Sequence, residues 1–254
     1  MIPGKGSAGG MRRGESLLYS RRHGIAFAHY PKTAGHSMVK WFRETFPDAA
    51  FVKPDPIHPV SHLSVRESLD HLGIAPQSLR FLGRSGRNAV GSLARHILLF
   101  PRPPLRIIGV VREPLAMLVS LFEYWKSYDF GAEPITPLIR AAKTGSFKTF
   151  LEHAILRREL PKYDNFFDVG GQAWGNTRLL DLESLDADLA ALTDEWGIET
   201  PVTRLDRCNV GPRQGRDLSL YLDEAGALVD VARSYFGWYY RRRSAAATPV
   251  RRAA

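Results

Sequence analysis

The segment HYPKTAGHSM, residues 29–38, combines residue types that bind an anion. Lys32 supplies a positive charge, and the hydroxyl groups of Thr33 and Ser37 can donate hydrogen bonds to phosphate-like oxygens. Gly35 would let a ligand come close to the backbone. The segment therefore predicts an anion-binding loop, although the Walker pattern GxxxxGK followed by Ser or Thr is absent. An ordinary loop between a strand and a helix, with Lys32 in solvent, is the alternative.

A second segment, IIGVVREPLAMLVSLF, residues 107–122, has the same organisation. An apolar run ends before Arg112, and a helix would begin at Glu113 or Pro114. Ser120 follows on that helix. Arginine binds phosphate groups through its planar set of N–H donors, so the segment predicts a second anion contact. A structural ion pair of Arg112 with Glu113 or another carboxylate is the alternative.

These two segments need elements that position them. The apolar runs GIAFAHY (24–30) and LRIIGVV (105–111) predict buried strands, each leading into a helix. Strands that alternate with helices indicate an α/β fold of three layers, with a central parallel sheet flanked by helices. Each helix N-terminus would add unpaired N–H groups and positive potential at its loop. The predicted helices cover residues 37–46, 113–128, 146–158, 175–195 and 217–242, and Ser64 with Glu67 forms a capping-box pattern.

The 254-residue chain carries a formal net charge of +9. Such an excess favours an anionic partner, which can be nucleic acid, acidic lipid, acidic polysaccharide or a polyphosphorylated cofactor. Cys208 is the single cysteine, so an internal disulfide is excluded. No cluster of zinc ligands suggests a metal site.

Both ends of the chain have the composition of tails. We expect a flexible tail over residues 1–20, one domain over 21–243 and a flexible basic tail over 244–254. No apolar run is long enough to span a membrane, and the first residues lack the apolar centre of a secretory signal. We therefore expect a soluble, cytoplasmic protein.

Taken together, the two segments resemble the cofactor loops of the sulfotransferases that use 3'-phosphoadenosine 5'-phosphosulfate (PAPS). In that family a PKTGGTS-like loop binds the 5'-phosphosulfate and an R-x-P…S segment binds the 3'-phosphate. The resemblance covers roughly residues 24–240, and ARHILLF, GNTRLL and DRCNV are weaker similarities to the carbohydrate sulfotransferases. It implies a P-loop-like three-layer α/β fold and a bacterial cytoplasmic enzyme that uses PAPS without a metal ion. A trimmed catalytic domain is the alternative.

The resemblance also assigns site residues. Those around the 5'-phosphosulfate would be Lys32, Thr33, Ala34, Gly35, His36 and Ser37, and those that hold the 3'-phosphate would be Arg112 and Ser120. The chain departs from the family where Ala34 and His36 replace the usual Gly and Thr, and where Met117 replaces a frequent second arginine. A solvent-facing histidine is the alternative for His36.

Sulfuryl transfer needs two catalytic roles. Lys32 would stabilise the departing bridging oxygen, which gains negative charge. A general base must take the proton of the acceptor hydroxyl. His96 in LARHILLF resembles a family position in a segment that lines the acceptor pocket, and a structural histidine is its alternative. Glu123 and His62 are weaker candidates for the base.

The acceptor is inferred from what the chain lacks. It has neither the PKSGTTW-like loop nor the RKGxxGDW stretch of the family members that act on small phenols and steroids. We expect a hydroxyl group of a carbohydrate or glycolipid, which the basic charge allows to be acidic, and no nucleic acid. Two other classes stay open: a nucleotide kinase-like P-loop enzyme, which would need a Walker lysine and magnesium carboxylates, and a non-catalytic protein that binds polyanions.

Overall fold

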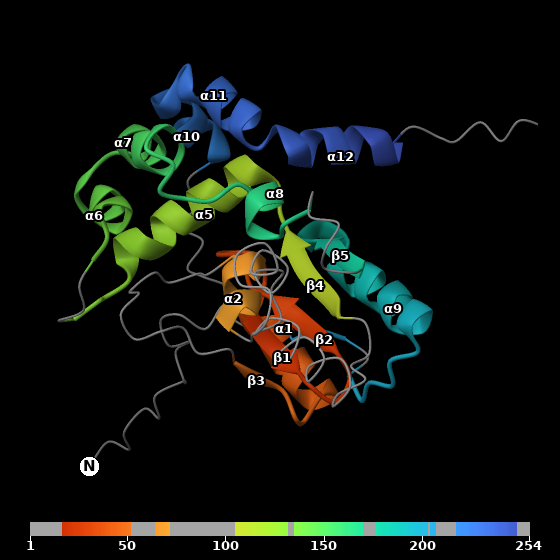
Figure 1. The fold of residues 1–254 in the computed structure, drawn as a ribbon. Helices are drawn as coiled ribbons and strands as arrows, with labels where there is room; N and C mark the ends of the chain where they lie inside the picture. The colour runs from red at the N-terminus through yellow and green to blue at the C-terminus, as the bar shows by residue number, and fades with distance from the viewer. Residues whose placement is uncertain are drawn as a thin grey trace, which may run out of the picture.

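A five-stranded sheet lies at the centre of the structure, with helices on both of its faces (Figure 1). The strand order is β3-β1-β2-β4-β5. The strands are β1 (Leu17–Ser20), β2 (Ile25–Ala28), β3 (Ala50–Phe51), β4 (Arg106–Val111) and β5 (Asn176–Asp181). The computed structural model describes residues 17–51, 64–71, 105–131, 135–169, 176–202, 204–206 and 217–247.

The sheet is mixed, whereas the sequence predicted a parallel sheet. The strands β2, β4 and β5 run parallel, with Ala28 opposite Gly109 and Gly109 opposite Leu179. The strands β1 and β3 run antiparallel to their neighbours. A short turn joins β1 to β2, and a connection of that length can only reverse the chain direction. The predicted three-layer α/β class is confirmed.

The described helices that come first along the chain are α1 (Gly35–Thr45), α2 (Val65–His71), α5 (Pro114–Ser127), α6 (Pro137–Thr144) and α7 (Phe147–Leu151). They are followed by the π-helix η2 (Glu152–Leu156), α8 (Tyr163–Phe166), the 3-10 helix η3 (Leu182–Ser184), α9 (Leu185–Trp196), α10 (Leu218–Ala225), α11 (Leu228–Tyr235) and α12 (Gly237–Ala247).

The predicted helices are confirmed where the apolar pattern is strong. Those at 37–46 and 113–128 correspond to α1 and α5. The capping box is confirmed, because Ser64 N donates to Glu67 Oε2 at 2.7 Å and Glu67 N donates to Ser64 Oγ at 3.3 Å.

Three other helix predictions need correction. The helix predicted over 175–195 is wrong in its first part, where β5 pairs with β4 and α9 begins later. The stretch 217–242 contains α10, α11 and part of α12, because Gly226 and the turn at Phe236 interrupt it. The stretch 146–158 changes from α-helix to π-helix at Glu152.

The folded domain extends beyond the predicted limits at both ends. Leu17 and Leu18 of β1 are buried, although the sequence predicted a tail over residues 1–20. The helix α12 likewise continues past residue 243. The pairing of β1 with β2 explains the difference, because contacts with a neighbouring strand do not depend on local composition.

Alternate residues of β4 face two different cores. Ile107 and Val111 pack in the larger core, which includes α5, α6, α7 and α10–α12, while Ile108 and Val110 pack in the core with α1 and α9. Gly109 faces the larger core at a point of close approach. A Cβ there would lie 2.4 Å from Cε1 of Phe167 and 2.6 Å from Cδ2 of Leu179.

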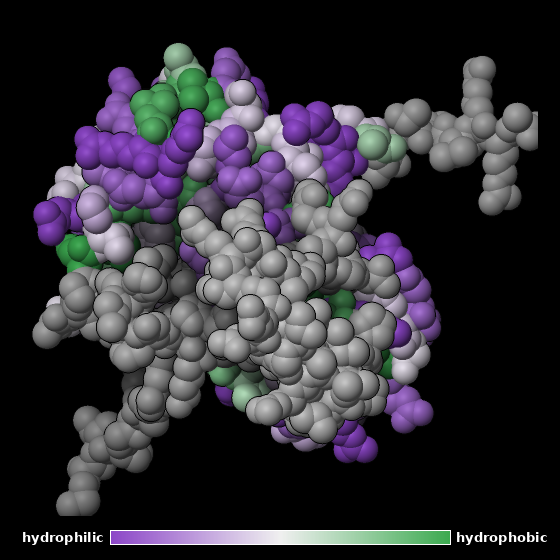
Figure 2. Space-filling model, viewed as in Figure 1, coloured by the Kyte–Doolittle hydropathy of each residue, from purple (hydrophilic) through white to green (hydrophobic). Residues whose placement is uncertain are grey.

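The surface in Figure 2 is mainly hydrophilic over its coloured part, and apolar side chains gather over α10 and α11. Leu220 of α10 and Val231 of α11 are among the exposed apolar residues, at 57% and 40%. Within the described ranges, no helix is both long enough and apolar enough to cross a membrane.

Gly109→Ala is expected to lower the free energy of unfolding by about 1–3 kcal/mol, because the added methyl group overlaps the side chains of Phe167 and Leu179. Urea unfolding of the full chain measures this change. Gly237→Ala is the matched control, since its added Cβ would meet the mobile end of Arg241 at 3.1 Å. Equal stability of the two variants would contradict the close packing at Gly109.

Candidate functional site

Three parallel strands end at one edge of the sheet. Because β2, β4 and β5 run in the same direction, they lead into the loop at residues 29–34, the pair Arg112–Glu113 and the helix η3. Open α/β sheets bind ligands beyond the carboxyl ends of their strands. The two segments with candidate anion-binding residues therefore lie at adjacent positions of this edge.

The loop between β2 and α1 has an unusual backbone. Lys32 and Ala34 adopt the left-handed conformation, with φ of 61° and 60°. This conformation costs a residue that has a side chain roughly 1–2 kcal/mol. Ala34 is also the N-cap of α1, and its side chain makes no capping hydrogen bond. Loops with such left-handed residues can direct N–H groups toward an anion.

Contacts with α8 and the residues before it hold this loop. The Tyr30 hydroxyl donates to the carbonyl oxygen of Pro161 at 2.6 Å. The Tyr30 ring meets those of Tyr163 and Phe166 edge-on, at centroid distances of 4.6 and 5.0 Å. Within the loop, Thr33 Oγ1 donates to the Tyr30 carbonyl oxygen at 2.8 Å. The protein itself therefore stabilises the loop conformation.

Two loop residues have structural roles that the sequence did not predict. Thr33 is fully buried and directs its hydroxyl proton to Tyr30, so its side chain does not face a ligand. Gly35 is required by packing, because a Cβ there would lie 1.8 Å from Nε2 of His29. Any contribution of Thr33 and Gly35 to an anion site is therefore through their backbone N–H groups.

Lys32 and Arg112 bring positive charge to this loop, and His36 lies beside Lys32. Burial, followed by the charge of Arg112, lowers the pKa of the Lys32 ammonium. Burial, followed by the charge of Lys32, lowers the pKa of the His36 imidazole. Both shifts include repulsion between like charges, so Lys32 lies close enough to each of the other two groups to interact with it. A bound anion would relieve this repulsion.

Arg112 has no acidic partner in the described ranges, and neither does Lys32. The carboxylate of Glu113 is engaged elsewhere: its Oε2 accepts from Ala116 N at 2.7 Å, and its Oε1 accepts from the Tyr240 hydroxyl at 2.6 Å. The alternative of an ion pair between Arg112 and Glu113 is therefore wrong.

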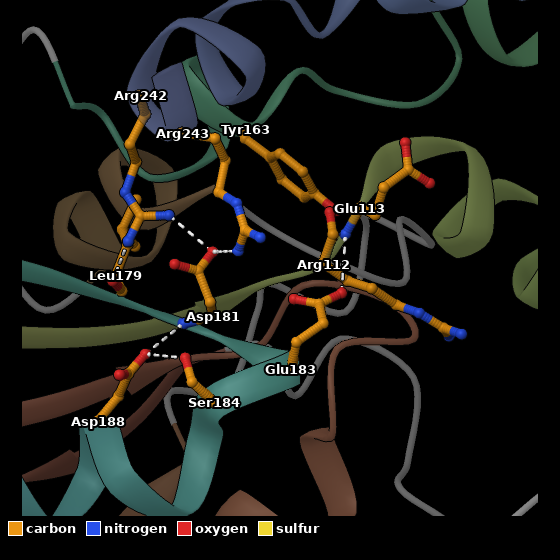
Figure 3. Close-up of polar contacts among 10 residues, drawn as sticks. All are labelled: Arg112, Glu113, Tyr163, Leu179, Asp181, Glu183, Ser184, Asp188, Arg242 and Arg243. Carbon is orange, nitrogen blue, oxygen red and sulfur yellow. Dashed lines mark hydrogen bonds and ion pairs between the residues drawn. The ribbon is translucent and has the colours of Figure 1, made fainter. Parts of the chain in front are cut away.

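The arginine points out of the polar network beside it. Figure 3 shows the guanidinium of Arg112 directed away from the carboxylates of Asp181 and Glu183. Its carbonyl oxygen accepts a hydrogen bond from the Tyr163 hydroxyl at 2.9 Å. The backbone of Arg112 is thus held in place while its charged group extends from the strand end.

Ser120 lies on the part of α5 that Lys32 approaches. The Lys32 Nζ is 4.2 Å from the ring centroid of Tyr124, which is close enough for a cation–π interaction. Ser120 precedes Tyr124 by one helical turn, so the two lie on the same face of α5. Met117, which replaces a frequent arginine of the sulfotransferases, is fully buried in the core.

The other candidates are placed as follows. Ser37 is buried in the first turn of α1. The carboxylate of Glu123 accepts a hydrogen bond from the Tyr221 hydroxyl at 2.7 Å, so Glu123 connects α5 to α10. This contact favours a structural role for Glu123 over that of a general base. His96 and His62 lie outside the described residues.

The end of β5 is held by α12. Asp181 accepts a hydrogen bond from Nη1 of Arg242 at 2.8 Å, and Nη1 of Arg243 lies 3.7 Å from the same oxygen. Arg242 also donates through Nη2 to the Leu179 carbonyl oxygen at 2.7 Å (Figure 3). Asp181 is therefore neutralised by two arginines.

Three tyrosines at the site were missed by sequence reasoning. Tyr124 could have been found, because it follows Ser120 by four positions on a predicted helix. Tyr163 and Tyr240 contact Arg112 and Glu113, from which they are 51 and 127 positions away. No local pattern identifies contacts over such separations.

Comparisons of the chain with protein-family models, curated proteins and solved structures found no match. In the part of the chain that the structure describes, no group of three or more His, Cys, Asp or Glu side chains is placed to hold a metal ion. A cationic cluster at a sheet edge, next to a helix N-terminus, is suited to an anionic ligand.

The charge of Lys32 is expected to control the titration of His36. Lys32→Ala removes the cation that disfavours protonation of His36, so the pKa of His36 should rise toward its ordinary value. NMR titration of the full chain measures it, with the His36 signal assigned by its loss in His36→Gln.

Lys126→Ala is the matched control for this titration. The Nζ of Lys126 also lies over an aromatic ring, 5.3 Å from the ring centroid of Phe122. Lys126 is exposed, however, and does not contribute to the pKa shift of His36. A His36 pKa that is the same in Lys32→Ala and in the wild type would contradict the proximity of the two charges.

Proposed function

We propose that the chain is a sulfotransferase that transfers a sulfuryl group from PAPS to a hydroxyl group of a carbohydrate or glycolipid. The observation that carries the proposal is that Lys32 and Arg112 follow two adjacent, parallel strands at one edge of the sheet. Neither has a carboxylate partner in the described ranges. PAPS carries two separate anionic groups, which suits two such cationic positions.

In this proposal each half of the site binds one anionic group of PAPS. The 5'-phosphosulfate lies at the start of α1, with Lys32, the loop backbone and His36. The 3'-phosphate lies with Arg112, just before α5, and with Ser120, in the middle of α5. A P-loop-like arrangement of β2, loop and α1 belongs to the same proposal, and the left-handed residues of the loop support it.

The proposed reaction exchanges one bond of sulfur for another. The acceptor oxygen bonds to sulfur as the bond from sulfur to the bridging oxygen of the 5'-phosphate breaks, and the acceptor proton passes to a general base. Lys32 donates to the bridging oxygen as charge develops there. Its lowered pKa makes it a stronger proton donor. His96 remains the predicted base.

A nucleotide kinase fits these residues less well. Its magnesium ion would need free carboxylates near the phosphate-binding loop. Asp181, at the end of β5, is instead paired with Arg242 and Arg243. A non-catalytic polyanion-binding protein accounts for the net charge but not for a half-buried lysine packed on Tyr124.

Lys32→Ala is expected to lower the rate at which PAPS releases 3'-phosphoadenosine 5'-phosphate (PAP) by about 10²–10³, because a donor to the departing oxygen is lost. Binding of PAP should remain measurable, since the other contacts persist. The release rate is measured by chromatography of the nucleotides. Lys126→Ala is the control, and an undiminished rate in Lys32→Ala would exclude the catalytic role.

Arg112→Ala is expected to weaken PAP binding by about 10- to 100-fold, because a charged hydrogen-bonding partner of the 3'-phosphate is lost. Binding of adenosine 5'-phosphate, which lacks that phosphate, should change little. Arg106→Ala is the matched control, because Arg106 lies at the opposite end of β4 and donates to the Trp196 carbonyl oxygen. Equal losses for both nucleotides would count against the assignment.

A thermal-shift experiment on the full chain tests the function as a whole. PAP should raise the melting temperature at micromolar concentration, because a ligand that binds the native state stabilises it. ATP with magnesium, and an oligonucleotide, should have little effect at that concentration. Stabilisation by the oligonucleotide alone would favour the polyanion-binding protein, and stabilisation by ATP with magnesium alone would favour the kinase.

A further inference from the structure

Three aromatic side chains follow one another from Lys32 along α5 and past its end. We call Tyr124, Tyr128 and Phe130 the aromatic strip. The ring centroids of Tyr124 and Tyr128 are 5.2 Å apart, and those of Tyr128 and Phe130 are 4.8 Å apart. Tyr128 is 41% exposed, and the other two are partly buried. The strip is therefore continuous and partly open to solvent.

An ammonium group lies over each end of the aromatic strip. The Lys32 Nζ is 4.2 Å from the ring centroid of Tyr124. The Nζ of Lys143, on α6, is 5.3 Å from the ring centroid of Phe130 and donates a hydrogen bond to the Tyr128 carbonyl oxygen. In the residues that the structure describes, no carboxylate forms an ion pair with either lysine.

Two acidic residues of the described segment that carries the strip have other hydrogen-bond partners. Asp129, within the segment that carries the strip, accepts a hydrogen bond from Gly131 N at 2.9 Å. Glu123, on α5, accepts one from the Tyr221 hydroxyl. Among the described residues, the strip thus combines aromatic rings with two lysines that have no carboxylate partner.

The arrangement of rings favours a chain of sugars over a planar base. Partly exposed aromatic rings bind the apolar C–H faces of sugars, while hydroxyl and ammonium groups bind their polar edges. The rings of the strip are tilted by 38° and 68° to their neighbours, so they do not form one flat stacking surface.

We propose that the aromatic strip binds the acceptor, an acidic oligosaccharide whose reacting sugar lies at Tyr124 beside Lys32 and whose next sugars extend over Tyr128 and Phe130 toward Lys143. This inference rests on the proposed function, because Lys32 marks the point of sulfuryl transfer. Because the strip begins at Lys32, the oligosaccharide would run from its reacting sugar at Lys32 toward Lys143. Lys143, at the far end of the strip, provides charge complementarity to a carboxylate or sulfate group of the oligosaccharide.

The test is calorimetric titration of the full chain, saturated with PAP, with two hexasaccharides. Unsulfated chondroitin hexasaccharide carries carboxylates, and maltohexaose is neutral. The acidic hexasaccharide should bind more tightly than the neutral one. Tyr128→Ala should weaken its binding about tenfold through loss of ring contact, whereas Tyr128→Phe should bind as the wild type does. Lys143→Gln should weaken binding of the acidic hexasaccharide alone.

Phe51→Ala is the matched control for the ring deletion. Phe51 is a partly buried aromatic residue on β3, and the Cζ of Arg43 lies 5.0 Å from its ring centroid. The strand β3 is the edge strand of the sheet at the opposite side from β5. This variant should bind the acidic hexasaccharide as the wild type does. Failure of the wild type to bind that hexasaccharide would overturn the inference, and so would unchanged binding in both Tyr128→Ala and Lys143→Gln.

Titration with PAP alone separates this inference from the proposed function. Normal PAP binding together with any of the overturning results above would reject the aromatic strip and leave the sulfotransferase proposal standing. Absence of PAP binding by the wild type would reject both. Normal PAP binding by Tyr128→Ala, expected because Tyr128 is 41% exposed, would show that its weaker saccharide binding is local.

Discussion

The parallel pairing of β2 with β4 is the constraint on which the candidate site depends. Ala28, the last residue of β2, lies opposite Gly109, which is two residues before the end of β4, so both strands run out toward the same edge of the sheet. Lys32 follows Ala28 by four residues and Arg112 follows Gly109 by three, which brings the two cations to one edge. Two cations without carboxylate partners in the described ranges raise the energy of the ligand-free protein, and an anion lowers it.

Tyr163 connects the two halves of this edge. Its hydroxyl donates to the carbonyl oxygen of Arg112, and its ring packs against Tyr30 at the start of the anion-binding loop. The same packed layer includes Phe167, which occupies the space that a side chain at Gly109 would need. The short helix α8 therefore packs against the core and contacts both loops. These contacts stabilise the left-handed conformation of Lys32 and Ala34.

The local parts of this arrangement could be predicted from the sequence, and the distant parts could not. The runs before Lys32 and Arg112 are apolar enough to identify β2 and β4, and the helices after them follow from periodicity. The antiparallel strand β1 could not be predicted, because it is short and its partner determines its structure. The burial of Thr33 was also missed, since a hydroxyl group in a loop fits a ligand contact and an internal hydrogen bond equally well.

The helix α12 comes late in the chain but completes an edge that much earlier residues form. Tyr240 binds Glu113 across 127 positions, and Arg242 binds Asp181 across 61. During synthesis on the ribosome, the strands β2, β4 and β5 emerge before these partners exist. The carboxylates of Glu113 and Asp181 must remain hydrated until α12 has left the exit tunnel. The cationic site thus lies near an acidic group, Asp181, that lacks its two arginine partners in the nascent chain, and the positive potential of this edge increases when α12 docks.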